Sequence, residues 1–435
     1  MTIPSWSLSE RDVRIAKVQQ LRDLGINPYP QKFEKKHMIC DLIAQWSWWS
    51  LRSIDNILLW SKQEYHTAGR LVLKRVSGKL SFAKIIDESG EIQIMFEHQA
   101  TKIAESERLN TTNKSEEWNS TKSFDYRFVD KMLDIGDFIG VRGELFVTHK
   151  GELTLFVSEY KLLSKAIRPL GDKFHGIGDD QEKAYRQRYL DMIFNRETLE
   201  RMKLRSRFIR SLREFYWSQG FIELDCPVLT PSASGAAAKP FVTHHNDFDT
   251  DFYLRICNET ELKKATIGWL EKVFTIAADF RNEWSDPSHL QEFMMLEHQN
   301  VYKSYHEDMQ FTEMMFDYIF DTLTLSRTII VKDKMGMAKE VNFTTPWPKI
   351  DYVEWVNKAS GLDISSYTID DADKLRADIR AKWYEFEWMD QMGTMTLIDY
   401  LYKKVLRPTI TWPAFIYHYP RIIAPLARIS DEDPN

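Results

Sequence analysis

The chain has 435 residues, of which 43% are hydrophobic and 28% charged, and its net charge is −6 at neutral pH. Such a composition is ordinary for a soluble globular protein, and the length allows two or three domains with a large core. No apolar run approaches the roughly 20 residues of a membrane helix, and residues 1–10 lack the basic and apolar regions of a signal peptide, so we expect no membrane partner.

The chain begins with a predicted helix over residues 9–30. Ser9 is a suitable N-cap, apolar residues recur at helical spacing from Val13 to Leu21, and Gly25 marks the end. We assign residues 1–62 to this helix and a linker.

The pattern then changes to short alternating runs separated by turn residues, over residues 63–165. Five of these runs are strand candidates: 71–73, 82–86, 92–96, 138–141 and 154–157. Five short strands with such turns predict a small closed β-barrel of the kind that binds single-stranded nucleic acid by stacking bases on surface aromatics. A polar stretch over residues 100–125 is predicted to be an insertion.

A basic segment follows the barrel and includes a predicted linker at 166–179. Between Lys161 and Arg213 there are 14 Lys and Arg residues against 7 Asp and Glu residues, a net charge of +7. Within an acidic protein this segment is suited to a local contact with a phosphate backbone, although a solvated helix with mixed charges would look the same. Helices are expected from 180 to 219, ended by Gly220 at a C′ position.

Residues 180–435 mix strand-like and helical runs and are predicted to form a second large domain. The predicted elements are a strand at Phe252–Ile256, a helix at Asn258–Ile267, a strand at Val273–Ile276, a helix at His306–Arg327 and a strand at Phe415–Tyr417. The predicted fold class is therefore α+β, with a β-barrel followed by an antiparallel sheet that is flanked by helices.

Three cysteines, Cys40, Cys226 and Cys257, are scattered and have no metal-binding spacing. We expect reduced, buried thiols in a cytoplasmic protein.

One stretch combines residue types that suit a nucleotide site. Arg281 and Glu283 are two apart on a predicted strand, and a loop leads to His289 and a second strand that carries Phe293 and Glu297. The Arg fork could grip phosphate oxygens, the Phe ring could meet a base, and the carboxylates could receive amino groups. The alternative is an ordinary hairpin with a surface Arg/Glu pair.

The run from Phe280 to Glu297, FRNE followed by SHLQEFMMLE, resembles motif 2 of class II aminoacyl-tRNA synthetases. From Arg11 to Ala427 the chain resembles the bacterial-type lysyl-tRNA synthetases of that class. Further stretches support the resemblance: 69–70, 78–82, 173–176, 185–191, 235–241 and, as motif 1, 220–227. The resemblance implies an OB-fold anticodon domain, ATP and Mg²⁺ as cofactors, L-lysine and tRNA(Lys) as substrates, and a homodimer built on motif 1.

The resemblance also implies roles for single residues. Arg281 would be catalytic, clamping the ATP α-phosphate and the substrate carboxylate. Glu283 would accept from the adenine amino group, His289 would reach the outer phosphates, and Phe293 would stack on adenine. The α-ammonium of lysine would bind Glu259 and Glu297, with Gly235 leaving room for its approach. Reading of the anticodon is implied for Phe82, Gln93 and Glu152, although Phe82 alone could equally be a core residue.

Two features depart from the family. The chain contains no Gly-x-Gly-x-Gly-x-Asp-Arg run (motif 3) and none of the carboxylates that hold Mg²⁺ there, so we expect a fragment of a synthetase with no metal ligands within this chain. Two alternatives stay open: a non-catalytic RNA-binding paralogue, and a related class II enzyme for aspartate or asparagine. The 235–241 run and Glu259 favour lysine.

The second departure concerns tryptophan, because the chain has 14 Trp and only 17 Gly, against the roughly 30 Gly expected at about 7%. Trp269 and Trp284 stand where the family has Gly, and Leu290, Gln291 and Gln299 also differ from it. Our hypothesis is that some Trp residues are UGA codons read as glycine in the source organism. The candidates are Trp46, Trp48, Trp49, Trp60, Trp269 and Trp284, whereas Trp347 fits the family as a true Trp.

Overall fold

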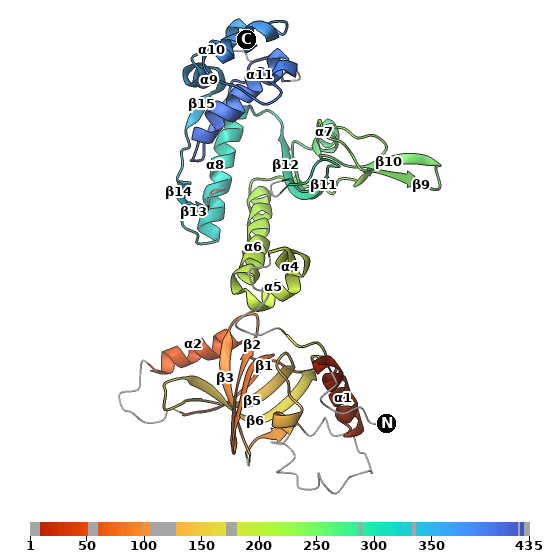
Figure 1. The fold of residues 1–435 in the computed structure, drawn as a ribbon, viewed down its shortest axis with the longest axis vertical. Coiled ribbons are helices and arrows are strands. Elements are labelled where there is room, and N and C mark those ends of the chain that lie inside the picture. The colour runs from red at the N-terminus through yellow and green to blue at the C-terminus, as the bar shows by residue number, and fades with distance from the viewer. Residues whose placement is uncertain are drawn as a thin grey trace. The chain divides into compact units, whose positions relative to one another are not determined.

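A computed structural model describes residues 9–50, 60–98, 100–104, 128–170, 181–286, 289–332, 336–424 and 427–429. The chain divides into two compact units, Met1–Arg201 and Met202–Asn435. Each unit has its own hydrophobic cluster or clusters, and we describe each by itself (Figure 1). Of the candidate tryptophans, the side chains of Trp48 and Trp49 lie outside the described residues.

The first unit contains the predicted barrel. Its strands are β1 (Trp60–Ser77), β2 (Leu80–Ile86), β3 (Glu91–Glu97), β4 (Lys102–Ile103), β5 (Phe138–Val147) and β6 (Leu153–Ser164). The sheet order is β3-β2-β1-β5-β6-β4, and a parallel pairing of β3 with β6 closes it. Alternate residues of β2 and β3 are buried inside, as the period-2 pattern requires. The prediction of a closed barrel is confirmed.

Two helices accompany the barrel, α1 (Glu10–Asp23) and α2 (Ile39–Ser50). Ser9 caps α1 as predicted, because its Oγ accepts from the Asp12 N–H at 3.2 Å. The helix is shorter than the predicted 9–30. It ends where Gly25 adopts a φ of 73°, with the Gly25 and Ile26 N–H groups bonded back to carbonyls of the last turn.

Helices α4 (Gln181–Arg186), α5 (Arg188–Phe194) and α6 (Arg196–Ser218) follow, within the predicted helical region. Helix α6 ends like α1: Gly220 has a φ of 80°, its N–H bonds to the Trp217 carbonyl, and the Phe221 N–H bonds to the Tyr216 carbonyl.

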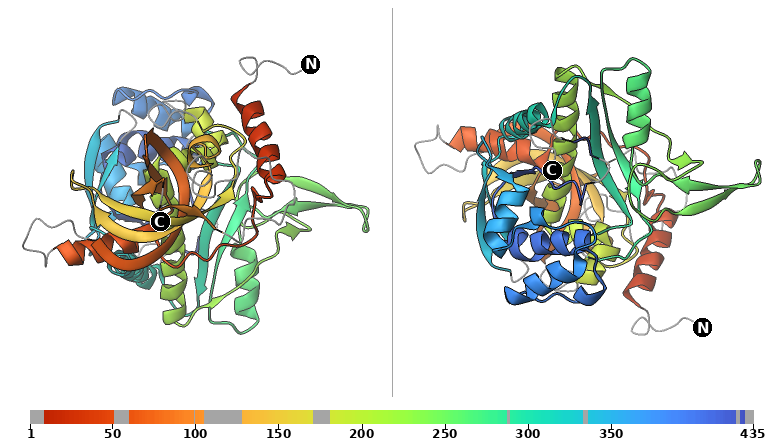
Figure 2. Two further views of the ribbon diagram at one scale, coloured as in Figure 1. Left: turned by 90° about the horizontal axis from the view of Figure 1, so that it is seen from below. Right: turned by 90° about the horizontal axis from the view of Figure 1, so that it is seen from above.

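The second unit is organised around a long antiparallel strand pair, β11 (Lys272–Phe280) and β12 (Glu292–Asn300), which Figure 2 shows from two further sides. Strand β7 (Ile222–Glu223) pairs in parallel with β11, and α7 (Glu259–Ile267) packs on both long strands. A second small sheet contains β8 (Leu229–Thr230), β10 (Thr250–Leu254) and β9 (Val242–His245). Antiparallel strands flanked by helices agree with the predicted fold class.

The remaining elements of this unit include α8 (Tyr305–Thr322), which is shorter than the predicted His306–Arg327 and ends before the β13–β14 hairpin. The elements after α8 are β13 (Thr328–Lys332), β14 (Ala338–Asn342), β15 (Lys349–Asp351), α9 (Tyr352–Ser360), α10 (Ala372–Ala381), α11 (Thr394–Leu401) and β16 (Phe415–Tyr417). Strand β15 pairs in parallel with β16, and the helices share a cluster of buried side chains.

Two helices of the second unit end on a tryptophan in the left-handed region. Trp269 follows α7 with a φ of 76°, and Trp383 follows α10 with a φ of 67°. Their side chains are 93% and 95% exposed, so no packing compensates the backbone strain. Trp347 is different: it is buried, and its Nε1 donates to the Phe343 carbonyl at 3.0 Å.

The cysteines are free, and Cys226 is buried as expected, but Cys40 is exposed on α2. The prediction of three buried thiols is wrong for Cys40, because the first turn of α2 turns that side chain towards solvent, and Cys257 is only half-buried. No helix within the described residues is long and apolar enough to cross a membrane.

Candidate functional site

One face of the β11–β12 pair gathers most of the candidate residues. Asp279 pairs with Phe293 in the strand register, and Thr275 pairs with Glu297. Directly opposed residues of antiparallel strands share a face. Beyond the last pair the Arg281 N–H still donates to the Gln291 carbonyl at 2.9 Å, which continues the alternation. Asp279, Arg281, Phe293 and Glu297 therefore share one side of the sheet.

Glu283 does not lie on the strand, contrary to the prediction that Arg281 and Glu283 share a strand face. Strand β11 ends at Phe280, and the Asn282 N–H donates to the Lys239 carbonyl at 2.7 Å instead of to β12. The Glu283 carboxylate accepts from the Lys239 N–H at 3.3 Å. Because the chain leaves the ladder here, Glu283 is held by the 235–241 run that the sequence also singled out.

The guanidinium of Arg281 is placed for an anionic ligand. Its Cζ lies 5.2 Å from the centroid of the Phe293 ring, and its Nε donates to the Ile256 carbonyl at 3.4 Å. No hydrogen bond or ion pair within the described ranges engages its two Nη groups. The structure thus brings together an aromatic ring and a half-buried Arg fork with unused donors, a combination suited to a base joined to a phosphate.

Glu297 is tied to the start of α7. The backbone N–H of Asn258, the N-cap residue of α7, donates to Glu297 Oε1 at 3.0 Å. Glu259, in the first turn of α7, pairs with Lys263 on the outer side of the helix. Gly235 comes close as well: it has a φ of 88°, and a Cβ at this position would lie 3.6 Å from the Cβ of Glu259.

The same glycine also contacts its neighbours more closely than the sequence suggested. A Cβ on Gly235 would collide with the Sγ of Cys257. The absence of a side chain at Gly235 therefore lets this loop pack against the start of α7. This packing role is separate from the room that the glycine would leave for a ligand. The three residues assigned to lysine, Gly235, Glu259 and Glu297, meet around one helix start.

His289 is not brought into this cluster by any interaction of the described residues. Its side chain is 74% exposed, and its Nδ1 lies 2.8 Å from the Asp286 carboxylate in a local bridge within the loop. Trp284, in the same loop, is also highly exposed.

Asp279 is a member of the cluster that the sequence analysis missed. Its side chain is completely buried, and Oδ1 accepts from Asn258 Nδ2 at 2.9 Å and lies 3.5 Å from Arg255 Nε. Burial, reinforced by the negative charge of Glu297, raises the pKa of Asp279 to about 6, while Arg255, Asn258 and Arg281 offset part of this rise. Its position two residues before Arg281 is the only signal in the sequence.

The raised pKa predicts a pH-dependent effect of Asp279→Asn on stability. The carboxyl group binds its proton more tightly in the folded chain than in the unfolded chain. Its destabilising effect is therefore absent below about pH 4, grows as the pH rises through the interval up to about 6, and is complete above it. We expect the variant to raise the free energy of unfolding by about 2–3 kcal/mol at pH 8 and by about a third of that at pH 4.5. Urea unfolding at both pH values tests this, and an equal gain at both would contradict it.

The barrel places its three predicted residues on one outer face. Phe82 on β2, Gln93 on β3 and Glu152, the residue before β6, all lie outside the core, and the buried neighbours of Phe82 are Ser81 and Ala83. Gln93 Nε2 donates to the Thr154 hydroxyl at 2.8 Å, and Lys84 links Glu152 to the same strands through an ion pair of 3.2 Å. For Phe82 the core reading is wrong, because the strand alternation turns it outward.

The basic segment keeps some unpaired charge. Arg186, Arg196 and Arg210 form local ion pairs with acidic residues one turn away. Arg201, Arg205 and Arg207 on α6 are exposed and have no ion-pair partner among the residues that the structure describes. The described part of α6 is thus a solvated helix with mixed charges, and the contact with a phosphate backbone stays a prediction.

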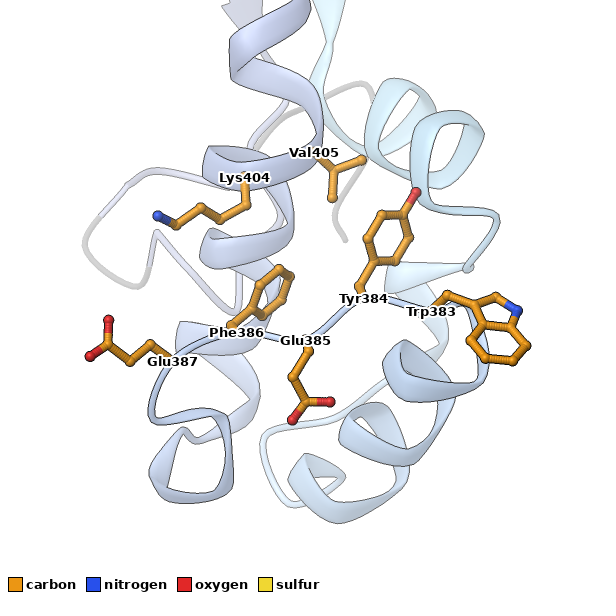
Figure 3. Close-up of a pocket in the computed structure, with 7 residues that line it drawn as sticks. All are labelled: Trp383, Tyr384, Glu385, Phe386, Glu387, Lys404 and Val405. Atoms are coloured by element: carbon orange, nitrogen blue, oxygen red, sulfur yellow. The ribbon is translucent and has the colours of Figure 1, made fainter.

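A separate hollow of about 550 Å³ lies in the C-terminal part of the second unit (Figure 3). It is lined by Trp383, Tyr384, Glu385, Phe386, Glu387, Lys404 and Val405. Figure 3 shows the carboxylates of Glu385 and Glu387 and the ammonium of Lys404 spread apart instead of converging on one point. None of these residues belongs to the β11–β12 cluster. Throughout the described ranges no group of three or more His, Cys, Asp or Glu side chains could hold a metal ion.

Comparison with known proteins identifies two protein families that match the chain. A family model of class II tRNA synthetases (D, K and N) matches residues 180–435, and a model of the OB-fold nucleic acid binding domain matches residues 65–163. The lysine–tRNA ligase of Carboxydothermus hydrogenoformans is 35% identical over 423 residues, which are 97% of this chain and 78% of that protein. The lysine–tRNA ligase of Wolinella succinogenes is 37% identical over 422 residues, 97% of this chain and 77% of that protein.

Proposed function

Because the chain belongs to the class II tRNA synthetases, we propose that it activates L-lysine with ATP and transfers it to the 3′ end of tRNA(Lys). The observation that carries the proposal is the shared face of Arg281, Phe293 and Glu297, which offers a phosphate grip, a ring for a base and a carboxylate for an amino group. We place the activity in the cytoplasm.

In the first step an oxygen of the lysine carboxylate attacks the α-phosphorus of ATP. A P–O bond forms, the bond to the β-phosphate breaks, and pyrophosphate leaves. Arg281 would neutralise charge on the α-phosphate and orient the carboxylate, with Phe293 beneath the adenine and Glu283 at its amino group. His289 would meet the outer phosphates from its loop. Mg²⁺ is expected to arrive with ATP, but the described residues include no ligand cluster for it, so we derive no step through the metal.

Lysine would bind through its α-ammonium at Glu297 and Glu259. Glu297 is held by one oxygen, Oε1, and this leaves Oε2 for the ligand. In the second step a hydroxyl of the terminal ribose attacks the activated carbonyl carbon, AMP leaves with the electron pair of the broken bond, and the hydroxyl proton passes to the AMP phosphate or to solvent.

Acylation of tRNA tests this function. The purified chain is incubated with ATP, tRNA and radiolabelled lysine, aspartate or asparagine in parallel. We expect label on tRNA with lysine alone. Transfer of aspartate or asparagine would assign a different member of the family. Binding of tRNA without transfer of any amino acid would support the RNA-binding alternative.

The barrel would read the anticodon loop through Phe82, Gln93 and Glu152. Replacing Phe82 with alanine removes the stacking surface, and we expect about tenfold weaker binding of tRNA(Lys), since a stacked base contributes about 1–3 kcal/mol. Fluorescence anisotropy with labelled tRNA measures the change. Phe138→Ala is the matched control, because Phe138 is also an outward aromatic of the barrel and packs under Arg70. Equal losses for both variants would argue against a specific platform.

The chain would act as a homodimer through motif 1. Support comes from apolar side chains that are exposed on α6, within motif 1 and directly after it: Met202, Phe208, Trp217, Ile222, Val228 and Leu229. Such a concentration is typical of a surface that a second copy covers. We expect Ile222→Asp to give monomers in light scattering, whereas Val242→Asp, an equally exposed site on β9, should leave the dimer intact. A monomeric unchanged chain would contradict the dimer.

A further inference from the structure

Asp279 lies on the same face of the β11–β12 pair as Glu297, but it has no role in the reaction as proposed above. We infer that Asp279 is a positioning residue for the substrate amino group: through Asn258 it fixes the carboxylate of Glu297, and its own charge strengthens the negative potential there. This inference rests on the proposed function, because it assumes that Glu297 receives the α-ammonium of the amino acid.

The first support is a continuous path of hydrogen bonds. Asp279 Oδ1 accepts from Asn258 Nδ2 at 2.9 Å, and the backbone N–H of the same Asn258 donates to Glu297 Oε1 at 3.0 Å. One residue is thus bonded to both carboxylates. The bond to Asp279 holds Asn258 in place, and a displacement of the Asn258 backbone would change its contacts with both carboxylates.

The second support is the unusual use of an N-cap residue. An Asn at this position normally accepts from an N–H of the first helical turn through its side chain. Asn258 makes no such cap bond; its amide group faces Asp279, and its Oδ1 is buried without a partner in the described structure. The Asn258 side chain therefore bonds to Asp279 and does not cap α7.

The third support concerns the cation beside Asp279. Arg255 is buried, but its Nε donates to the Ala278 carbonyl at 2.9 Å and its Nη1 donates to the Cys226 carbonyl. The guanidinium is therefore engaged mainly by backbone oxygens, and it stands 3.5 Å from Asp279 Oδ1. The other oxygen of Asp279, Oδ2, is buried and has no partner in the described part of the chain.

These contacts argue against a purely structural role. A buried carboxylate with a free oxygen, next to a second carboxylate, is unfavourable for folding. An Asn at position 279 would accept the same hydrogen bond from Asn258 without that penalty. The buried Arg255 and the nearby Arg281 offset only part of this cost. A further cation at Glu297 would offset more of it, and the substrate ammonium is such a cation.

Two variants separate orientation from charge. Asp279→Asn keeps an acceptor for Asn258 but removes the charge, whereas Asp279→Ala removes both. Calorimetric titration with L-lysine and, separately, with ATP gives the two dissociation constants. We expect about tenfold weaker lysine binding for Asp279→Ala, an intermediate loss for Asp279→Asn, and unchanged ATP binding for both.

A control variant distinguishes positioning from general destabilisation. Ser360→Ala removes a buried hydroxyl that bonds within the C-terminal cluster of the same unit, away from the β11–β12 face. It should lower the melting temperature without changing lysine binding. Unchanged lysine affinity in both Asp279 variants, or equal losses for lysine and ATP, would overturn the inference. If the unchanged chain binds neither ligand, the proposed function itself fails and the inference fails with it.

Discussion

Replacing Arg281 with alanine is expected to slow formation of lysyl-adenylate by about 10²–10³-fold, the usual effect of losing one donor that stabilises charge in a transition state. Arg281 is the only cation that the structure places on the β11–β12 face next to Phe293 within the described residues. No partner among the described residues engages its two Nη groups, which would bind the α-phosphate and the attacking carboxylate together. Lysine-dependent exchange of pyrophosphate into ATP measures the rate of adenylate formation. Direct titration with ATP measures the dissociation constant for ATP without requiring turnover.

Two further variants sharpen this test. Arg281→Lys keeps the charge but loses the planar fork, and we expect it to recover only a small part of the activity. Arg213→Ala is the control, because this Arg pairs with Glu223 at 2.9 Å and does not belong to the β11–β12 face. Equal rates for the unchanged chain and Arg281→Ala would remove Arg281 from the mechanism.

The second large effect is a gain of stability when Trp269 and Trp383 are replaced together by glycine. In both places the tryptophan is the C′ residue of a helix. The tryptophan N–H donates to the carbonyl three residues earlier in the chain, and the N–H of the following residue donates to the carbonyl five residues before that following residue. Gly25 and Gly220 occupy the same position after α1 and α6. An L-residue in the left-handed region costs about 1–2 kcal/mol, so the double variant should gain about 3 kcal/mol.

The measurement is the free energy of unfolding in urea. Trp269→Ala is the matched control, since alanine removes the exposed ring but keeps the strained backbone, and it should gain little. Trp347→Gly should lose about 3–5 kcal/mol, because this Trp is buried against aromatic neighbours. If Trp269→Ala and Trp269→Gly gain equally, strain is not the cause.

These tryptophans also bear on the hypothesis that some are UGA codons read as glycine. The structure separates the candidates: Trp46 packs against the barrel core and Trp60 stacks on Phe146, whereas Trp269 is exposed and strained. Two further tryptophans, Trp383 and Trp388 with a φ of 64°, have a left-handed backbone like that of Trp269. They become candidates for this reason, which the sequence alone did not reveal. The hypothesis expects UGA in the gene at Trp269 and Trp284, to which the structure adds Trp383, and UGG at Trp347. Reading UGG at the first two positions would end it.

Much of the fold could be predicted because its signals are local. Alternation in residues 82–86 and 92–96 reports which side chains enter the barrel, and Ser9, Gly25 and Gly220 mark helix ends through their own conformational preferences. The exact end of α1 was missed because apolar residues beyond Gly25 pack on the barrel without continuing the helix.

The site was predicted less completely, since it depends on contacts between distant segments. Phe293 and Glu297 could be placed beside Arg281 because a single hairpin joins them. The departure of Glu283 from the strand could not be predicted, because it depends on a hydrogen bond between the Asn282 N–H and the Lys239 carbonyl. Asp279 was missed for the same reason, because its contacts with Asn258 and Arg255 join distant segments.

A structure of the chain with a non-hydrolysable lysyl-adenylate analogue tests the central claim most directly. We expect the adenine on the ring of Phe293, the phosphate within reach of both Nη groups of Arg281, and the α-ammonium at Glu297. An analogue bound elsewhere, such as in the hollow beside Lys404, or a β11–β12 face left empty at saturating ligand, would contradict the account.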